Sequence, residues 1–191
     1  ISVAVPVGDE TADRLIAKLI PRIEKLKVGP YTGGNDVDYG PVVTAAAKAN
    51  ILRLVESGVA AGAKLVVDGR GFKMQGYEGG FFVGPHLFDH VTSDMEIYRK
   101  EIFGPVLSVL TFRTVDEAIE KANNTAYGLS AGVWTDKGAR ILKLAAELKA
   151  GVVWANTYNK FDPASPFGGY KESGFGREGG RQGLLDYCKL D

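Results

Sequence analysis

The amino-acid sequence predicts an α/β protein with a mostly parallel sheet, helices on both faces of the sheet and a glycine-rich loop region towards the C-terminal end. Two observations support this fold class. Short apolar segments rich in β-branched residues alternate with segments of helical period along residues 1–155, which is typical of βαβ units. After residue 155 the sequence turns glycine-rich and aromatic, and seven glycines fall between residues 168 and 183.

Strand and helix signals alternate in the first half of the chain. Residues 1–7 alternate in character and are rich in β-branched side chains, which predicts a strand. Asp9 is expected to cap the helix that follows, whose apolar stripe continues to about residue 26. Pro21 lies inside this stripe and is expected to kink or split the helix. The next expected elements are a loop over residues 28–41, a helix over 44–61, a short buried strand over 64–67, an exposed loop or hairpin over 72–80 and an extended segment over 81–88.

Capping residues mark three further helices. Ser93 and Thr114 are each followed three residues later by glutamate, which is the spacing of a capping box. The first box is expected to start a short helix, and the second a longer helix with apolar residues at i, i+3, i+4 and i+7. Asp136 is expected to cap a helix to about residue 149, with Gly151 just beyond its end. Strands are expected over residues 106–112, 129–135 and 152–155.

Composition limits the class of protein. A chain of 191 residues and 20.5 kDa predicts one domain-sized unit over residues 1–191. Because 23 basic residues balance 23 acidic ones and the two signs are interleaved, we expect no nucleic-acid partner and no anionic-membrane partner. No apolar run is long enough to span a membrane, and the opening residues lack the features of a signal peptide. A single cysteine suits the cytoplasm or another reducing compartment.

Three motifs that suggest chemistry have simpler interpretations. Cys188 has no histidine or carboxylate nearby in sequence, so we interpret it as a small apolar packing residue rather than a nucleophile. His86 and His90 are four residues apart, but Pro85 disfavours a helix there, and we expect no metal site. GFGREG (residues 174–179) fits G-x-G-x-x-G, yet no strand signal precedes it, so we expect a tight loop leading into a short helix rather than a dinucleotide site.

Two other segments leave a functional and a structural interpretation open. Residues 100–105, KEIFGP, place a carboxylate and an aromatic ring before a glycine-proline break and a buried strand. Loops at strand ends build ligand sites in α/β proteins, so this carboxylate is either a ligand for ribose hydroxyls or an ordinary surface group. Residues 166–174, PFGGYKESG, with Phe161 upstream, form either the wall of a cavity or a rigid packed loop.

Taken together, four segments resemble the aldehyde dehydrogenase superfamily, in the part of its catalytic domain that begins just after the nucleophile. They are KEIFGPVLSV (residues 100–109), ANNTAYGLSAGVWT (122–135), GVVWANTY (151–158) and SPFGGYKESGFGRE (165–178). The front of the chain, to about Leu110, is similar to methylmalonate-semialdehyde dehydrogenases, and the back is more similar to general NAD(P)-dependent aldehyde dehydrogenases.

The resemblance implies covalent chemistry on a small aldehyde. In the family a cysteine thiolate attacks the aldehyde, a hydride passes to the nicotinamide of NAD or NADP, and the thioester is hydrolysed or passed to coenzyme A. By resemblance, Glu101 would bind the nicotinamide-side ribose. Phe103 would pack beside the nicotinamide, and Leu129 would lie near it. Phe161 and Phe167 would wall the aldehyde tunnel.

The resemblance also implies that parts of the enzyme lie outside these residues. The family's nucleophilic cysteine would lie just before Ile1, and Cys188 does not match its position. The general-base glutamate, the oxyanion asparagine, the dinucleotide-binding domain and the C-terminal oligomerisation strand have no counterpart here. We therefore expect a fragment without a catalytic residue, inactive alone and prone to self-association, from an enzyme that is a homo-oligomer when complete.

Three interpretations stay open at this point. The chain is either part of that enzyme or a non-enzymatic module, such as a pseudoenzyme or a piece that pairs with a full subunit. An isolated nucleotide-binding domain is a third interpretation, which requires saturable NAD binding that is sensitive to Glu101→Ala.

Overall fold

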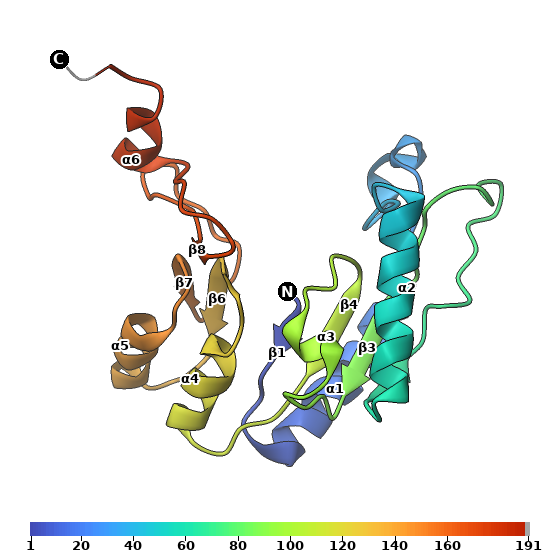
Figure 1. Ribbon diagram of the computed structural model, residues 1–191, viewed down its shortest axis with the longest axis horizontal. Coiled ribbons are helices and arrows are strands. Elements are labelled where there is room, and N and C mark those ends of the chain that lie inside the picture. The colour runs from blue at the N-terminus through green and yellow to red at the C-terminus, as the bar shows by residue number, and fades with distance from the viewer. Residues whose placement is uncertain (190–191) are drawn as a thin grey trace. The chain divides into compact units, whose positions relative to one another are not determined.

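The computed structural model describes residues 1–189 and consists of two compact units, unit 1 (Ile1–Thr114) and unit 2 (Val115–Asp191) (Figure 1). Helices and strands alternate along both units, so the predicted α/β class is confirmed. The assignment of residues 1–191 to a single catalytic-domain-like unit, without a dinucleotide-binding domain or an oligomerisation strand, stays a prediction. Within residues 1–189, no helix has both the length and the apolar character needed to cross a membrane.

Unit 1 is built on a four-stranded sheet. Its strands are β1 (Val3–Ala4), β2 (Lys64–Val67), β3 (His86–Asp89) and β4 (Val106–Val109), in the order β1-β4-β3-β2. Strand β4 is parallel to both of its neighbours, whereas β2 is antiparallel to β3 and carries a bulge between Leu65 and Val67. The sheet is therefore mostly parallel, as predicted.

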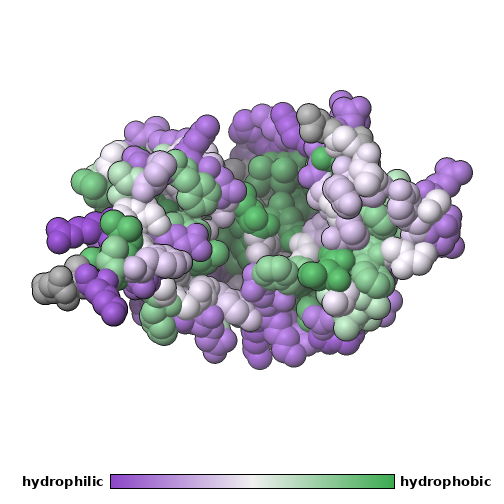
Figure 2. Space-filling view, turned by 90° about the horizontal axis from the view of Figure 1, so that it is seen from above, coloured by the Kyte–Doolittle hydropathy of each residue, from purple (hydrophilic) through white to green (hydrophobic). Residues whose placement is uncertain are grey.

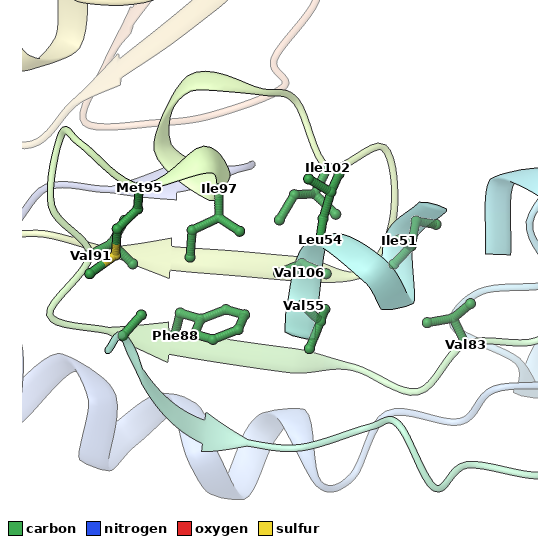
Figure 3. Close-up of a cluster of buried hydrophobic side chains, with 11 residues drawn as sticks. Ile51, Leu54, Val55, Val83, Phe88, Val91, Met95, Ile97, Ile102 and Val106 are labelled. Carbon is green, nitrogen blue, oxygen red and sulfur yellow. The ribbon is translucent and has the colours of Figure 1, made fainter. Parts of the chain in front are cut away.

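Helices cover both faces of this sheet. They are α1 (Gly8–Ile23), α2 (Ala45–Ala60) and the short α3 (Glu96–Arg99), and a 3-10 segment, η1 (Tyr31–Asp36), lies in the predicted loop. Successive side chains of a strand point to opposite faces. In β3, Leu87 accordingly packs in a cluster with residues of α1, whereas Phe88 packs in a cluster with residues of α2 and α3 (Figure 3). Both side chains are fully buried, and each burial contributes about 1.5–3 kcal/mol to folding.

The predicted cap of the first helix is wrong. The residue before α1 is Val7, which provides no side-chain cap, and Asp9 lies in the first turn of the helix. The cause is a tertiary contact, because the Gly8 N–H donates a 2.8 Å hydrogen bond to the carbonyl of Phe112. Asp9 keeps a favourable position near the positive end of the helix dipole and accepts a 3.1 Å hydrogen bond from the Thr111 hydroxyl.

Two other signals in unit 1 need comment. Pro21 does not split α1, because it lies in the last turn and the helix ends two residues later at Ile23, and the alternative of a kink stays a prediction. Ser93 does not cap α3, whose N-cap position is occupied by Met95. A turn intervenes, in which the Met95 N–H donates a 3.1 Å hydrogen bond to the carbonyl of Thr92, so the helix starts later than the capping box predicts.

The described part of unit 2, residues 115–189, contains short paired strands and three helices. They are α4 (Val115–Asn123), β5 (Tyr127–Gly128), β6 (Ser130–Val133), α5 (Gly138–Glu147), β7 (Val152–Ala155), β8 (Tyr170–Lys171) and α6 (Gly180–Leu185). Strands β6 and β7 are parallel, with Gly132 opposite Trp154, and β5 and β8 are antiparallel. The predicted glycine-rich loop region follows β7 and, up to residue 189, contains only β8 and α6 as regular structure.

The predicted boundaries of α5 are also wrong. Lys137 rather than Asp136 occupies its N-cap position. Thr135, the residue before Asp136, is held by the Asn156 side chain. The Asn156 amide oxygen accepts a 2.9 Å hydrogen bond from the Thr135 N–H, and the Asn156 amide nitrogen donates a 3.0 Å hydrogen bond to the Thr135 carbonyl. At the other end the helix stops at Glu147, and Gly151 already pairs with the neighbouring strand through a 3.0 Å bond to the Gly128 carbonyl.

Candidate functional site

The loop that precedes β4 in unit 1 alternates between exposed and buried side chains. Ile102 is 7% exposed and lies among the core side chains of α2 (Figure 3). Gly104 packs against Ile51, whose Cδ1 would lie 2.6 Å from a β-carbon at this glycine. Glu101 is exposed, and Phe103 is 78% exposed. The loop is thus anchored by Ile102 and Gly104 and leaves the Glu101 carboxylate and the Phe103 ring exposed to solvent.

A charge network fixes the start of the same loop. The Glu96 carboxylate accepts hydrogen bonds from Arg53 of α2, at 3.1 and 3.2 Å, and from Lys100, at 2.8 Å. These cationic donors lower the pKa of Glu96 to about 2. The neighbouring Glu101 has no hydrogen bond or ion pair among the residues that the structure describes. Its carboxylate oxygens are therefore available as acceptors.

The second candidate segment belongs to an aromatic cluster in unit 2, formed by Trp134, Trp154, Tyr158, Phe161 and Phe167. The rings of Phe161 and Phe167 meet edge to face, with centroids 5.0 Å apart and planes at 76°. Trp154 contacts both, at 5.5 Å from Phe161 and 6.4 Å from Phe167. The structure thus brings together the two phenylalanines that the sequence predicted as substrate-binding residues.

Leu129 lies in the same unit, between β5 and β6, and is 44% exposed. Its carbonyl accepts a 3.3 Å hydrogen bond from the Val152 N–H, which places it beside the start of β7. Gly151 at this point packs directly against the backbone of Gly168, the residue that follows Phe167. The backbone around Leu129 and the loop that carries Phe167 are therefore joined through a glycine–glycine contact.

Polar side chains hold the glycine-rich loop in place. The Arg177 guanidinium donates hydrogen bonds to the carbonyls of Gly169, at 2.8 Å, and Gly176, at 3.0 Å, and lies 5.2 Å from the ring centroid of Tyr170. Lys171 donates to the carbonyls of Asn123, the last residue of α4, and Thr125, both at 2.9 Å. Ser173 accepts a 3.0 Å bond from the Gly128 N–H. These contacts hold the glycine-rich loop through its carbonyls and tie it to α4 and β5.

The sequence interpretation missed these polar residues and Trp154, although they lie in the quoted motifs. A usable signal was present. A glycine-rich loop leaves many carbonyls without regular partners, so charged and hydroxyl side chains between its glycines are candidates to bind them. The position of Trp154 between two loops depends on tertiary folding and has no local signal.

The G-x-G-x-x-G segment is a tight loop, as predicted. Gly174 and Gly179 have φ values of +92° and +70°, which other residues rarely adopt. Phe167 and Glu178 exchange two backbone hydrogen bonds of 2.7 Å, which closes the loop before α6. The strand before it, β8, is antiparallel to β5, unlike the parallel strand that opens a dinucleotide-binding βαβ unit.

The remaining candidates have different environments. Cys188 is exposed, so its interpretation as a packing residue is wrong. His86 is buried at 2% exposure, and neither ring nitrogen has a hydrogen-bond partner. Burial lowers its pKa, although the nearby Asp68 carboxylate opposes this effect. His90 is exposed, and within residues 1–189 no group of three or more histidine, cysteine, aspartate or glutamate side chains is placed to hold a metal ion.

Comparison with known proteins identifies the family. The family model described as "Aldehyde dehydrogenase family" matches residues 4–191. A malonate-semialdehyde dehydrogenase of Pseudomonas aeruginosa is 48% identical over 92% of the chain, and a betaine aldehyde dehydrogenase of Brucella anthropi is 42% identical over 93%. The chain spans 35% and 36% of the lengths of these two curated relatives.

Solved structures agree with this match. A Sinorhizobium meliloti protein assigned as a methylmalonate-semialdehyde dehydrogenase and crystallised with NAD superposes with a TM-score of 0.90 at 46% identity, over 97% of this chain and 38% of that one. A Staphylococcus aureus betaine aldehyde dehydrogenase in complex with NAD+ gives a TM-score of 0.88 at 34% identity, over 97% of this chain and 37% of that one. The fold and sequence agree over nearly all of the 191 residues, and the chain belongs to the aldehyde dehydrogenase family.

Proposed function

We propose that this chain forms part of the cofactor and aldehyde sites of an enzyme that oxidises a small aldehyde or semialdehyde with NAD or NADP. The observation that carries the proposal is the edge-to-face contact of Phe161 and Phe167 at 5.0 Å. Both rings belong to a loop region held by backbone and polar contacts, which suits the wall of an apolar channel. Family membership supplies the reaction class.

The cofactor side of the proposal rests on residues 100–105 and on Leu129. The free carboxylate of Glu101 suits hydrogen bonds from ribose hydroxyls, and the exposed Phe103 ring suits packing against a nicotinamide. By family resemblance, the half-exposed Leu129 would add an apolar contact to the nicotinamide. The bound nicotinamide accepts the hydride in this chemistry. The anchors Ile102 and Gly104 keep the loop in position and so reduce the entropy lost when the cofactor binds.

On the substrate side, Phe161 and Phe167 would line the path of the aldehyde. Apolar walls exclude water from the reacting carbon and hold the carbonyl in place for attack. The attacking cysteine thiolate would come from polypeptide that precedes Ile1, and the thioester would pass to water or to coenzyme A. We therefore expect no turnover by the 191-residue chain alone. Cys188 does not match the position of the family's nucleophile, so we do not assign the thiolate's role to it.

Assembly and compartment follow from the same proposal. We expect the complete enzyme to be a homo-oligomer, as the family resemblance implies. We also expect it in the cytoplasm or another reducing compartment, since the chain has one cysteine. Large apolar side chains are exposed in both units, and apolar residues reach the face drawn in Figure 2. They include Val43, Phe103, Trp134, Leu142 and Phe175. This exposure favours self-association of the chain when it is isolated.

The test compares the 191-residue chain with the full-length gene product. Aldehyde-dependent NADH or NADPH formation is expected from the full-length product, and none from the chain alone. Cys188→Ala in the full-length product is expected to leave the rate unchanged. Turnover by the pure chain that Cys188→Ala abolishes would contradict the mechanism. A full-length product without any aldehyde-dependent reduction of NAD or NADP would favour the non-enzymatic module.

A further inference from the structure

Trp154 occupies the centre of the aromatic cluster. It lies in β7, is 8% exposed, and contacts the rings of Tyr158, Phe161 and Phe167 at centroid distances of 4.8, 5.5 and 6.4 Å. No other ring of the cluster contacts three partners within the described part of the chain. Because a strand residue is held by its sheet pairing, here opposite Gly132, Trp154 is the fixed point against which the two loop phenylalanines pack.

The three rings of Trp154, Phe161 and Phe167 form a closed triangle. Their centroid distances of 5.5, 6.4 and 5.0 Å all fall in the range of rings in direct contact. A ligand therefore has no room among the three rings. It would meet the outer faces of the phenylalanines, with Trp154 behind them.

A hydrogen bond also links Trp154 to the backbone beside Phe161. The indole N–H of Trp154 donates a 3.0 Å hydrogen bond to the carbonyl of Lys160, the residue before Phe161. Phe161 itself is 59% exposed, so little else buries its ring. The hydrogen bond fixes the backbone from which this ring projects, while the ring contact fixes its orientation.

We propose that Trp154 is a positioning residue that sets the spacing of Phe161 and Phe167 and thereby the length preference for aldehydes. The proposal rests on the proposed function of these two phenylalanines. Trp154 acts through Phe161 rather than by touching the substrate. Its loss is therefore expected to weaken the binding of aldehydes that extend along the two rings, and to affect the shortest aldehydes little.

The test measures steady-state kinetics of the full-length gene product with a two-carbon and a six-carbon aldehyde. Trp154→Phe keeps an aromatic ring, removes the N–H and reduces the ring area that packs against the phenylalanines. Loss of one hydrogen bond corresponds to about a fivefold effect, so KM for the six-carbon aldehyde is expected to rise about fivefold. The value of kcat and the KM for the two-carbon aldehyde are expected to stay near wild type. Trp134→Phe is the matched control, because Trp134 contacts Tyr158 and neither phenylalanine.

A double variant separates positioning from a general structural effect. In a Phe161→Ala background, Trp154→Phe is expected to add nothing to the KM for the six-carbon aldehyde, because its partner is gone. If Trp154→Phe lowers kcat and raises both KM values equally, or if its effect persists without Phe161, the positioning role is wrong. A wild-type product that oxidises no aldehyde would instead show that the proposed function itself is wrong, and the specificity role with it.

Replacement of Trp154 by benzothienylalanine covers the case in which Trp154→Phe fails to fold. This residue keeps the size of the indole and replaces its N–H by sulfur. The same rise in KM for the six-carbon aldehyde supports the hydrogen bond to Lys160 as the positioning contact, whereas unchanged KM values overturn it. Nuclear Overhauser contacts between the Phe161 and Phe167 rings in the 191-residue chain give a readout that needs no turnover. They are expected to weaken in the variant, and full retention of them would overturn the proposal.

Discussion

Gly151 and Gly168 lie so close together that a β-carbon on Gly151 would overlap the carbonyl oxygen of Gly168. One residue precedes β7 and the other follows Phe167, so this contact ties the glycine-rich loop to the β6–β7 pair. A second contact repeats the arrangement, because a β-carbon on Gly168 would overlap the carbonyl of Gly176. The predicted substrate wall thus depends on backbone approaches that only glycine permits.

Gly151→Ala is expected to destabilise unit 2. The added methyl meets backbone, which cannot move aside as a flexible side chain can, so we expect a loss of about 3 kcal/mol in the free energy of unfolding. Both tryptophans, Trp134 and Trp154, lie in unit 2, so denaturant unfolding followed by tryptophan fluorescence measures this unit. Gly138→Ala is the control, since a β-carbon there meets nothing within 4 Å. Equal stability of the two variants would contradict the packing described here.

His86 is expected to make stability depend on pH. Its buried, unpartnered ring has a folded-state pKa below the usual value of about 6.5, so the unfolded chain takes up a proton that the folded chain resists. By linkage, this contribution to stability is present at neutral pH and is lost as the pH falls below about 6.5. We predict that His86→Leu reduces the loss of stability between about pH 7.5 and about pH 5.5, as measured by urea unfolding. A His86→Leu variant that loses stability with pH as the wild type does would contradict this account.

The Glu96 network makes a prediction for one carboxylate. Because Arg53 is the main cause of the low pKa of Glu96, about 2, Arg53→Gln is expected to raise that pKa towards the ordinary value for glutamate. NMR titration of the Glu96 side-chain carbon measures the pKa directly. A depressed pKa stabilises the fold above the unfolded value, and this contribution is lost as the pH falls towards about 2. Arg14→Gln, in a different helix, is the control and is expected to leave the pKa of Glu96 unchanged. If Arg53→Gln also leaves the pKa of Glu96 unchanged, the described network is wrong.

The sequence predicted most of the architecture because the fold depends on repeated, local patterns. Residues 81–88 were expected to be extended, and because consecutive strand side chains point to opposite faces, Leu87 packs against α1 and Phe88 against α2 and α3. Phe161 and Phe167 were identified by resemblance, and the structure places their rings in contact. The roles assigned to Glu101, Phe103 and Leu129 stay predictions.

Features set by long-range contacts could not be read locally. The expected caps Asp9, Ser93 and Asp136 fit local motifs, but each helix starts elsewhere because of a neighbouring bond or turn. Asn156, for example, holds Thr135 extended from 21 residues away, so α5 begins later than Asp136 predicts. The local sequence around Trp154 predicts only a strand. Its contacts with Lys160, Phe161 and Phe167 depend on the tertiary fold.

The central claim is that this chain carries one cofactor-binding loop and one substrate wall of an NAD(P)-dependent aldehyde dehydrogenase. The most direct test measures the KM for NAD and for aldehyde in the full-length gene product, in Glu101→Gln and Phe161→Ala variants, with the exposed Glu120→Gln as control. We predict that Glu101→Gln raises KM for NAD about tenfold, that Phe161→Ala raises KM for aldehyde about tenfold, and that the control changes neither. Wild-type KM values in both variants would contradict the claim.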